Sequence, residues 1–175
     1  MSKKGVLVFD DKETGLILND FISKIISSDL DFINTRIIGI KNGGIVLADI
    51  IKKAVLEKLG IDCKIGYIDM TLYRDDPFAV KKSGDSTDIN FDINDKEILL
   101  VDDVISSGRT VRASIDEIFD FGRPTNIKLA VFIDKEGREL PICPDFTGRK
   151  IKADKNEIIN VNITSISDKK FVEKI

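Results

Sequence analysis

The chain has 175 residues, 42% of them hydrophobic and 33% charged, which is typical of a soluble globular protein with a single domain over 1–175. A net charge of −3 gives no electrostatic sign of nucleic-acid binding, and no apolar segment is long enough for a signal peptide or a membrane span. The absence of histidine excludes histidine-based catalysis and the common zinc sites. The two cysteines form no CxxC pair, and we expect them to be packing residues in a protein of the reducing cytoplasm.

The N-terminal part of the chain predicts a strand followed by a helix. Residues 6–9, Val-Leu-Val-Phe, are apolar enough for a short strand. Asp10 or Asp11 can then cap a helix near 11–28. The apolar face of this helix is formed by residues at helical spacing, namely Leu18, Phe21, Ile22, Ile25 and Ile26.

The next segment repeats the alternation of strand and helix. Arg36–Ile40 predicts a strand, and Lys41–Gly44 predicts a turn. The apolar pattern that follows predicts a helix to about Leu59, where Gly60 suits the C′ position. Cys63–Tyr73 then predicts another strand.

Residues 74–92 interrupt this alternation. They are polar and charged and have no periodicity, and a segment of this length inside a compact domain is usually functional or disordered. The segment alone is equally compatible with a solvent-exposed loop that has no function and with a lid over an active site.

The stretch from Ile98 to Thr110 carries the strongest chemical signal. Ile98–Val101 predicts a strand buried on both faces, as in the middle of a parallel sheet, and Asp102 and Asp103 follow where that strand is expected to end. The small residues Ser106–Gly108 then predict a turn before an amphipathic helix. Its apolar face is formed by Val111, Ile115, Ile118 and Phe119.

This stretch predicts a sugar-phosphate site. The first turn of the helix offers unpaired backbone N–H groups and the positive end of a dipole to a phosphate. The neighbouring carboxylates of Asp102 and Asp103 can accept hydrogen bonds from vicinal sugar hydroxyls. The plain alternative is an ordinary acidic pair near a helix N-terminus, stabilised by the helix dipole.

The C-terminal third completes an α/β pattern. Gly122–Pro124 ends the helix, and Ile127–Ile133 predicts another buried strand. The proline-rich Arg138–Phe146 predicts irregular or edge structure, and Glu157–Ile163 predicts a final strand. This alternation predicts a mainly parallel sheet with ligands at the carboxyl ends of its strands.

Two loops of phosphate-binding size would then lie along the same edge of the sheet. They are Lys41–Gly44 and Ile105–Thr110, and each lies between a predicted buried strand and a predicted helix. Neither matches the P-loop or the GxGxxG dinucleotide motif. Together they can hold two separate phosphate groups.

Several segments resemble a known family. Leu99–Thr110 resembles the phosphoribosyl pyrophosphate signature of type I phosphoribosyltransferases. A wider set of segments resembles the PyrR family, whose members are pyrimidine operon attenuation regulators and uracil phosphoribosyltransferases: Ile38–Lys41, Asp69–Asp76, Gly108–Ala113, Gly122–Pro124 and Arg138–Ile142. The resemblance implies a mainly parallel twisted sheet flanked by helices. It also implies a base-binding hood at about 134–152 with the N-terminal segment, and a lid at about 74–92.

The resemblance also implies roles for individual residues. Asp102 and Asp103 would contact the ribose directly or through water bound to Mg²⁺, and Arg74 would assist the leaving pyrophosphate. The pyrophosphate loop, where this fold class often has a strained peptide, would consist of Lys41, Asn42, Gly43 and Gly44. The remaining substrate-binding residues would be Tyr73, Val104, Ile105, Ser106, Ser107, Gly108, Arg109, Thr110 and Asp134.

The implied activity is transfer of ribose 5-phosphate from phosphoribosyl pyrophosphate to uracil by a cytoplasmic homodimer or larger homo-oligomer. Three departures keep alternatives open: Asn42-Gly43 replaces Thr-Arg, 135–137 replace Arg-Gly-His, and Leu16–Asn19 replace basic and histidine residues expected to bind RNA. One alternative is a catalytically weak RNA-binding regulator or nucleotide sensor. The other is a purine phosphoribosyltransferase.

Overall fold

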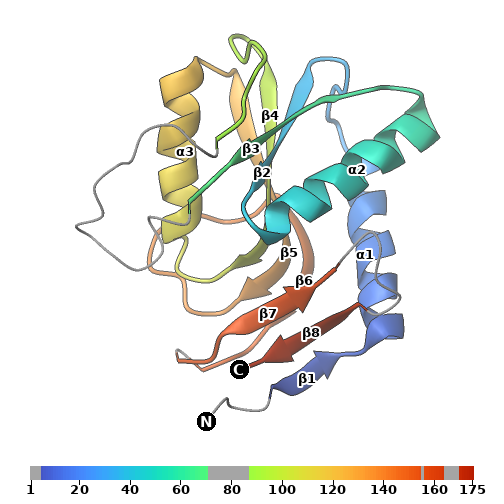
Figure 1. The fold of residues 1–175 in the computed structure, drawn as a ribbon, viewed down its shortest axis with the longest axis vertical. Helices are drawn as coiled ribbons and strands as arrows, with labels where there is room; N and C mark the ends of the chain where they lie inside the picture. Colours follow the sequence, from blue (N-terminus) through green and yellow to red (C-terminus); the bar gives the residue numbers. More distant parts are fainter. Residues whose placement is uncertain (1–4, 71–86, 155, 164–169) are drawn as a thin grey trace.

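The computed structural model describes residues 5–70, 87–154, 156–163 and 170–175. A five-stranded parallel sheet forms the centre of the molecule (Figure 1). Its strands, in spatial order, are β3 (Lys64–Ile68), β2 (Thr35–Ile40), β4 (Glu97–Ile105), β5 (Asn126–Lys135) and β6 (Phe146–Ile151). Three helices flank it: α1 (Asp11–Ile26), α2 (Gly43–Leu59) and α3 (Arg109–Phe121).

Both faces of this sheet are covered by helices. Leu99 and Val101 of β4 belong to the hydrophobic core shared with α1 and α2, whereas Ile98 and Leu100 belong to the core shared with α3. Figure 1 shows α3 on one side of the sheet and α1 and α2 on the other. Because successive strand residues face opposite sides, burial of both faces explains the unbroken apolar run at 98–101.

The first helix begins and ends close to the predicted bounds. Asp10 caps it by accepting a hydrogen bond from the Glu13 N–H at 2.9 Å, and the Glu13 carboxylate accepts one from the Asp10 N–H at 3.1 Å. On its buried face, the Phe21 ring meets the Phe132 ring of β5 edge to face, with centroids 5.9 Å apart. The second helix ends at Gly60, whose φ of 71° is the left-handed conformation expected of a C′ glycine.

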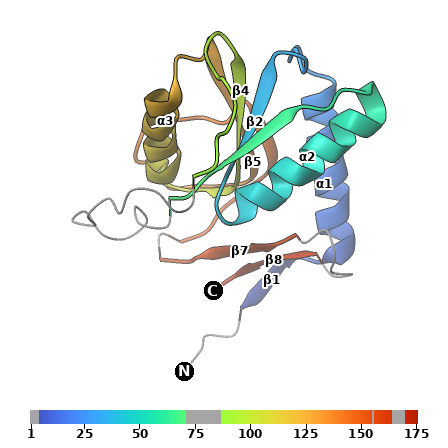
Figure 2. The ribbon, with the colours of Figure 1, turned by 45° about the horizontal axis from the view of Figure 1, so that its top comes forward.

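A small antiparallel sheet lies beyond the carboxyl ends of the large sheet's strands (Figure 2). Its strands, in spatial order, are β1 (Val6–Phe9), β8 (Phe171–Lys174) and β7 (Ile159–Asn162). The strands predicted at 6–9 and 157–163 therefore belong to a separate sheet, and β8 has no counterpart among the predicted elements. Residues 146–151, which we expected within the hood, form the edge strand of the large sheet.

One predicted strand end is wrong in a way that matters for the site. Strand β4 continues to Ile105, so Asp102 and Asp103 lie within the strand and not after it. Asp102 is in register with Val131, and Val104 with Ile133. The polar pair breaks the apolar pattern that marks the strand in the sequence, whereas the backbone ladder to β5 continues past it.

The order of the strands places a crevice at the carboxyl ends of β2 and β4. The chain passes from β2 through α2 to β3 on one side, and then crosses to β4 on the other side of β2. The loops after β2 and β4 therefore flank the point where the direction of winding reverses, which is where open α/β sheets bind ligands.

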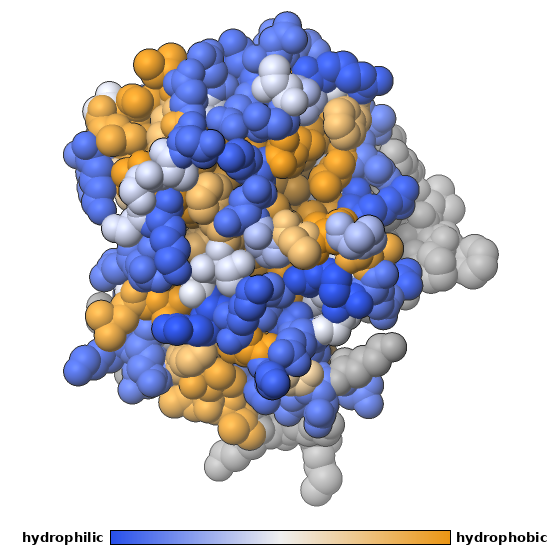
Figure 3. Space-filling model, turned by 180° about the vertical axis from the view of Figure 1, so that it is seen from behind, coloured by the Kyte–Doolittle hydropathy of each residue, from blue (hydrophilic) through white to orange (hydrophobic). Residues whose placement is uncertain are grey.

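Exposed hydrophobic side chains are dispersed over the surface. Figure 3 shows, on the face seen from behind, separate hydrophobic patches divided by hydrophilic side chains. In the described part of the chain, no helix is both long enough and apolar enough to cross a membrane.

Candidate functional site

The loop after β4 has the geometry of a phosphate cradle. Ser106, Ser107 and Gly108 form the turn, and α3 begins at Arg109. Gly108 has a φ of 91°. A residue with a side chain would be strained in this backbone conformation, so glycine suits this position. Because the first backbone N–H groups of a helix have no partner within it, this turn presents donors and a positive dipole end to an anion.

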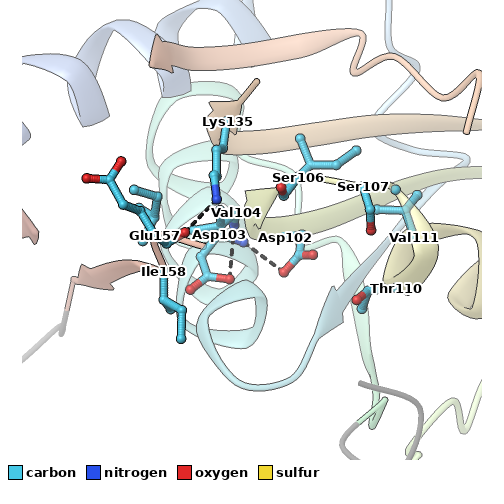
Figure 4. A pocket seen from close by; sticks show the side chains of 13 residues that line it. Asp102, Asp103, Val104, Ser106, Ser107, Thr110, Val111, Lys135, Glu157 and Ile158 are labelled. Carbon is cyan, nitrogen blue, oxygen red and sulfur yellow. Dashed lines mark hydrogen bonds between the residues drawn. The ribbon is translucent and has the colours of Figure 1, made fainter. Parts of the chain in front are cut away.

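The two carboxylates lie beside this loop, as Figure 4 shows. Asp102 is only 1% exposed, and its Oδ1 accepts a hydrogen bond from the Asp103 N–H at 2.9 Å. The half-buried Asp103 accepts one from the Val104 N–H at 3.0 Å. Each carboxylate is thus oriented by the backbone amide of the next residue, and both line the same cavity.

The loop after β2 brings α2 against these carboxylates. A Cβ atom on Gly43 would lie 2.2 Å from Asp103 Oδ2, and one on Gly44 would lie 2.3 Å from the Val101 carbonyl oxygen. Because the contact of Gly44 is with backbone, only glycine at this position allows the N-terminus of α2 to meet β4 so closely. The peptide bond between Lys41 and Asn42 is cis, and Lys41 Nζ lies 3.5 Å from Asp69 Oδ2.

Two adjoining cavities occupy the crevice. The first has a volume of about 400 Å³ and is lined by residues 102–108, Thr110, Val111, Lys135 and residues 157–159. The second has a volume of about 600 Å³ and is lined by Asn42, Gly43, Val46, Asp103, residues 158–163 and Ile175. Asp103 and residues 158–159 line both cavities, so the carboxylate lies between the phosphate cradle and the loop after β2.

Lys135 and Glu157 line the first cavity although the sequence prediction did not include them. Lys135 is 5% exposed, and its Nζ donates to the backbone carbonyl of Glu157, which joins the end of β5 to the segment before β7 (Figure 4). The hydrogen bond from the Asp154 N–H, followed by that from Lys174, holds the pKa of the Glu157 carboxyl below its ordinary value. The position of Lys135 directly after Asp134 was the available signal, because residues at strand ends reach the crevice.

Other predicted residues lie at the edge of the site or outside the described chain. The Asp134 carboxylate and the Arg109 side chain do not line either cavity, and they pair with Arg138 and Glu139 respectively. Tyr73 and Arg74 lie outside the described residues, as does most of the segment predicted as a lid. Of that segment, Asp88 forms an antiparallel bridge with Tyr67 beside β3.

Comparison with known proteins identifies the family. The chain is 42% identical to a bifunctional protein PyrR of Listeria monocytogenes over 95% of this chain and 93% of that protein. It is 36% identical to a bifunctional protein PyrR of Picosynechococcus sp., over 100% and 99% of the two chains. The chain belongs to the PyrR family. Consistent with this membership, residues 8–164 of the PyrR-family chain match the phosphoribosyl transferase domain.

Solved structures show that this PyrR-family chain has the predicted type I phosphoribosyltransferase fold. It is similar to the hypoxanthine phosphoribosyltransferase of Trypanosoma cruzi, with a TM-score of 0.64 and 16% identity over 91% of this chain and 82% of that one. It is also similar to a hypoxanthine-guanine phosphoribosyltransferase of Bacillus anthracis, with a TM-score of 0.61 and 20% identity over 86% and 85% of the two chains. At these identities the likeness concerns the fold.

Proposed function

We propose that this PyrR-family enzyme transfers the ribose 5-phosphate of phosphoribosyl pyrophosphate to uracil, forming UMP and pyrophosphate. The observation that carries the proposal is the position of Asp103, between a cavity with a phosphate cradle and a cavity lined by Asn42 and Gly43. A sugar with a phosphate at C5 and a pyrophosphate at C1 needs two anion sites separated by a group that binds its hydroxyls.

The donor occupies this crevice in a single orientation. Backbone amides of Ser106–Thr110 bind the 5′-phosphate at the start of α3. The carboxylates of Asp102 and Asp103 accept hydrogen bonds from the ribose hydroxyls. The pyrophosphate lies at Lys41–Gly44, where the start of α2 offers further amides.

The reaction breaks the C1–oxygen bond to pyrophosphate and forms a bond from C1 to N1 of the base, which loses its N1 proton. Positive charge develops on the sugar, where the adjacent Asp103 carboxylate stabilises it electrostatically. Negative charge develops on the pyrophosphate, where Lys41 and Arg74 act as cations. No strong general base is needed, in agreement with a chain that has no histidine.

The donor set suits Mg²⁺. The acidic residues that line the first cavity are Asp102, Asp103 and Glu157. The Glu157 carboxylate accepts hydrogen bonds from the Asp154 N–H and from Lys174, so the adjacent Asp102 and Asp103 are the ligands proposed for the ion. An ion held by so few protein ligands needs further oxygen atoms from substrate and water, and Mg²⁺ commonly binds in this way. When bound, Mg²⁺ neutralises charge on the leaving pyrophosphate.

Incubation with phosphoribosyl pyrophosphate, Mg²⁺ and a panel of bases tests the proposal. Membership of the PyrR family supports uracil as the acceptor, so UMP is the expected product, with uracil preferred to hypoxanthine and guanine. Binding of the donor without turnover of any base would contradict the enzymatic proposal. Turnover of hypoxanthine but not of uracil would show that the acceptor base is a purine.

We also propose that the enzyme acts in the cytoplasm as a homodimer or larger homo-oligomer. Cys63 is buried and Cys143 is exposed, and both are free thiols, as expected in a reducing compartment. Sedimentation equilibrium is expected to give a mass of at least twice the 19.5 kDa of one chain. A mass of 19.5 kDa would contradict the oligomer.

A second proposed activity is RNA binding. The relatives are called bifunctional, and Arg149, Lys150 and Lys152 are exposed on or next to the edge strand β6. Cations in such a cluster bind phosphates and make affinity depend on salt. Filter binding to a pyrimidine leader hairpin is expected to weaken in a variant carrying Arg149→Gln and Lys150→Gln but not in one carrying Lys53→Gln and Lys58→Gln. Absence of salt-sensitive binding by the unmodified protein would contradict this second activity.

A further inference from the structure

Arg138 lies behind the phosphate cradle and joins it to the end of β5. One guanidinium nitrogen donates to the backbone carbonyl of Ser106, and the other terminal nitrogen donates to Asp134 Oδ1 at 2.6 Å. The side chains of Arg138 and Asp134 are 22% and 11% exposed, so the ion pair is largely shielded from water. The guanidinium therefore holds the cradle backbone at a defined position relative to a buried carboxylate.

The backbone after Arg138 makes the same kind of contact one residue further along the cradle. The N–H groups of Glu139 and Leu140 both donate to the carbonyl of Ser107, at 3.0 and 3.1 Å. A Cβ atom on Gly108 would lie 3.5 Å from Arg138 Cδ and 3.6 Å from Leu140 Cβ, so the segment packs closely against the loop. Two successive cradle carbonyls are therefore directed at residues 138–140.

The direction of these carbonyls determines where the neighbouring amides point. In a trans peptide, the C=O and the following N–H lie in one plane and point in opposite directions. The Ser106–Ser107 and Ser107–Gly108 peptides are trans, since the cis peptide of the described chain is Lys41–Asn42. The N–H groups of Ser107 and Gly108 therefore point away from residues 138–140. Ser107 and Gly108 line the first cavity, whereas residues 138–140 do not, so these N–H groups are directed toward the cavity.

We propose that Arg138 is a positioning residue that aims the Ser107 and Gly108 amides at the 5′-phosphate of the substrate. The nature of the ligand rests on the function proposed above, whereas the orientation of the loop rests on the hydrogen bonds alone. Arg138 acts by geometry, because Asp134 neutralises its charge and Arg138 does not line the cavity. Lysine cannot replace it fully, since a single ammonium lacks the fork that reaches both acceptors.

Calorimetric binding of UMP and of uridine separates positioning from general structure. Arg138→Gln is expected to weaken UMP binding about tenfold, the effect of losing one charge-assisted hydrogen bond, while uridine affinity changes less than about twofold because uridine has no phosphate. Arg138→Lys is expected to give an intermediate loss for UMP. The matched control is Arg112→Gln, which removes an exposed ion pair with Asp116 on α3 and is expected to leave both affinities unchanged.

Amide NMR spectra give a second measurement. Addition of UMP is expected to shift the Ser107 and Gly108 amides strongly in the unmodified protein and weakly in Arg138→Lys, a mild change that serves if Arg138→Gln does not fold. Equal losses of UMP and uridine affinity in the Arg138 variants, or no loss of either, would overturn the positioning role. Failure of the unmodified protein to bind UMP would instead refute the proposed function.

Discussion

The contact between Gly43 and Asp103 predicts that a side chain at position 43 displaces the Asp103 carboxylate from its present position. An alanine Cβ would lie 2.2 Å from Asp103 Oδ2, 2.3 Å from its Cγ and 2.6 Å from its Cβ. Van der Waals contact needs more than 3 Å, so the Asp103 side chain has to rotate or the start of α2 has to move. Rotation is the easier change because the Asp103 carboxylate faces open space on both sides.

The magnitude follows from what the rotation removes. A carboxylate displaced from its ribose hydroxyl loses a hydrogen bond to a charged group, which contributes about 1.5–3 kcal/mol. At about 1.4 kcal/mol per factor of ten, Gly43→Ala is expected to lower kcat/KM for the donor about 10- to 100-fold. The free energy of unfolding is expected to change by less than about 1 kcal/mol, because alanine's better helix propensity offsets the cost of the shifted rotamer.

Steady-state kinetics with varied phosphoribosyl pyrophosphate, together with urea unfolding, measure both quantities. Gly43→Arg is the matched comparison, since it displaces Asp103 equally but adds a cation beside the pyrophosphate. We expect it to bind pyrophosphate about tenfold more tightly than Gly43→Ala, the effect of one charge-assisted contact. Unchanged kcat/KM in Gly43→Ala at unchanged stability would show that the position of Asp103 does not depend on Gly43.

Four further predictions test the site and the core. Asp102→Asn keeps the shape of the side chain but removes its charge, and is expected to lower kcat/KM for the donor about 10- to 100-fold in the same kinetic assay. Removing divalent cations with EDTA is expected to abolish UMP formation, and added Mg²⁺ to restore it. Phe132→Ala opens a cavity beside Phe21 and is expected to cost about 3–5 kcal/mol of unfolding free energy in urea, with little loss for the exposed Phe119→Ala. Burial and the hydrogen bond to Asp49 raise the pKa of Tyr67 to about 12; the stabilisation this represents is complete below the usual tyrosine pKa of 10.0 and is lost as the pH rises through 12. The tyrosinate absorbance that appears near pH 12 should therefore vanish in Tyr67→Phe.

The sequence by itself determined the parts of the fold that depend on local pattern. Apolar runs long enough for doubly buried strands predicted β2, β4 and β5, and the capping and glycine signals placed the ends of α1 and α2 within a few residues. Strand β8 escaped prediction because a four-residue edge-sheet segment has too little periodicity to stand out.

The turn before α3, which we propose as the phosphate cradle, was likewise predicted from the sequence. Small residues between a buried strand and an amphipathic helix specify such a loop whatever surrounds it, because the free amides belong to the first turn of the helix itself. The end of β4 was predicted too early, because the apolar run ends at Val101 whereas the hydrogen-bond ladder continues to Ile105. Asp102 and Asp103 therefore lie within the strand and not after it.

Only the tertiary structure decided how distant segments meet in the crevice. Three contacts in the crevice join residues many positions apart. They are the close approach of Gly43 to Asp103 and the hydrogen bonds from Lys135 to Glu157 and from Arg138 to Ser106. Such contacts depend on strand order and on the placement of the small sheet, which local propensity does not encode. The sequence thus predicted a loop that we propose binds a phosphate, and the packing of β2 beside β4 brings this loop next to the one proposed to bind the pyrophosphate.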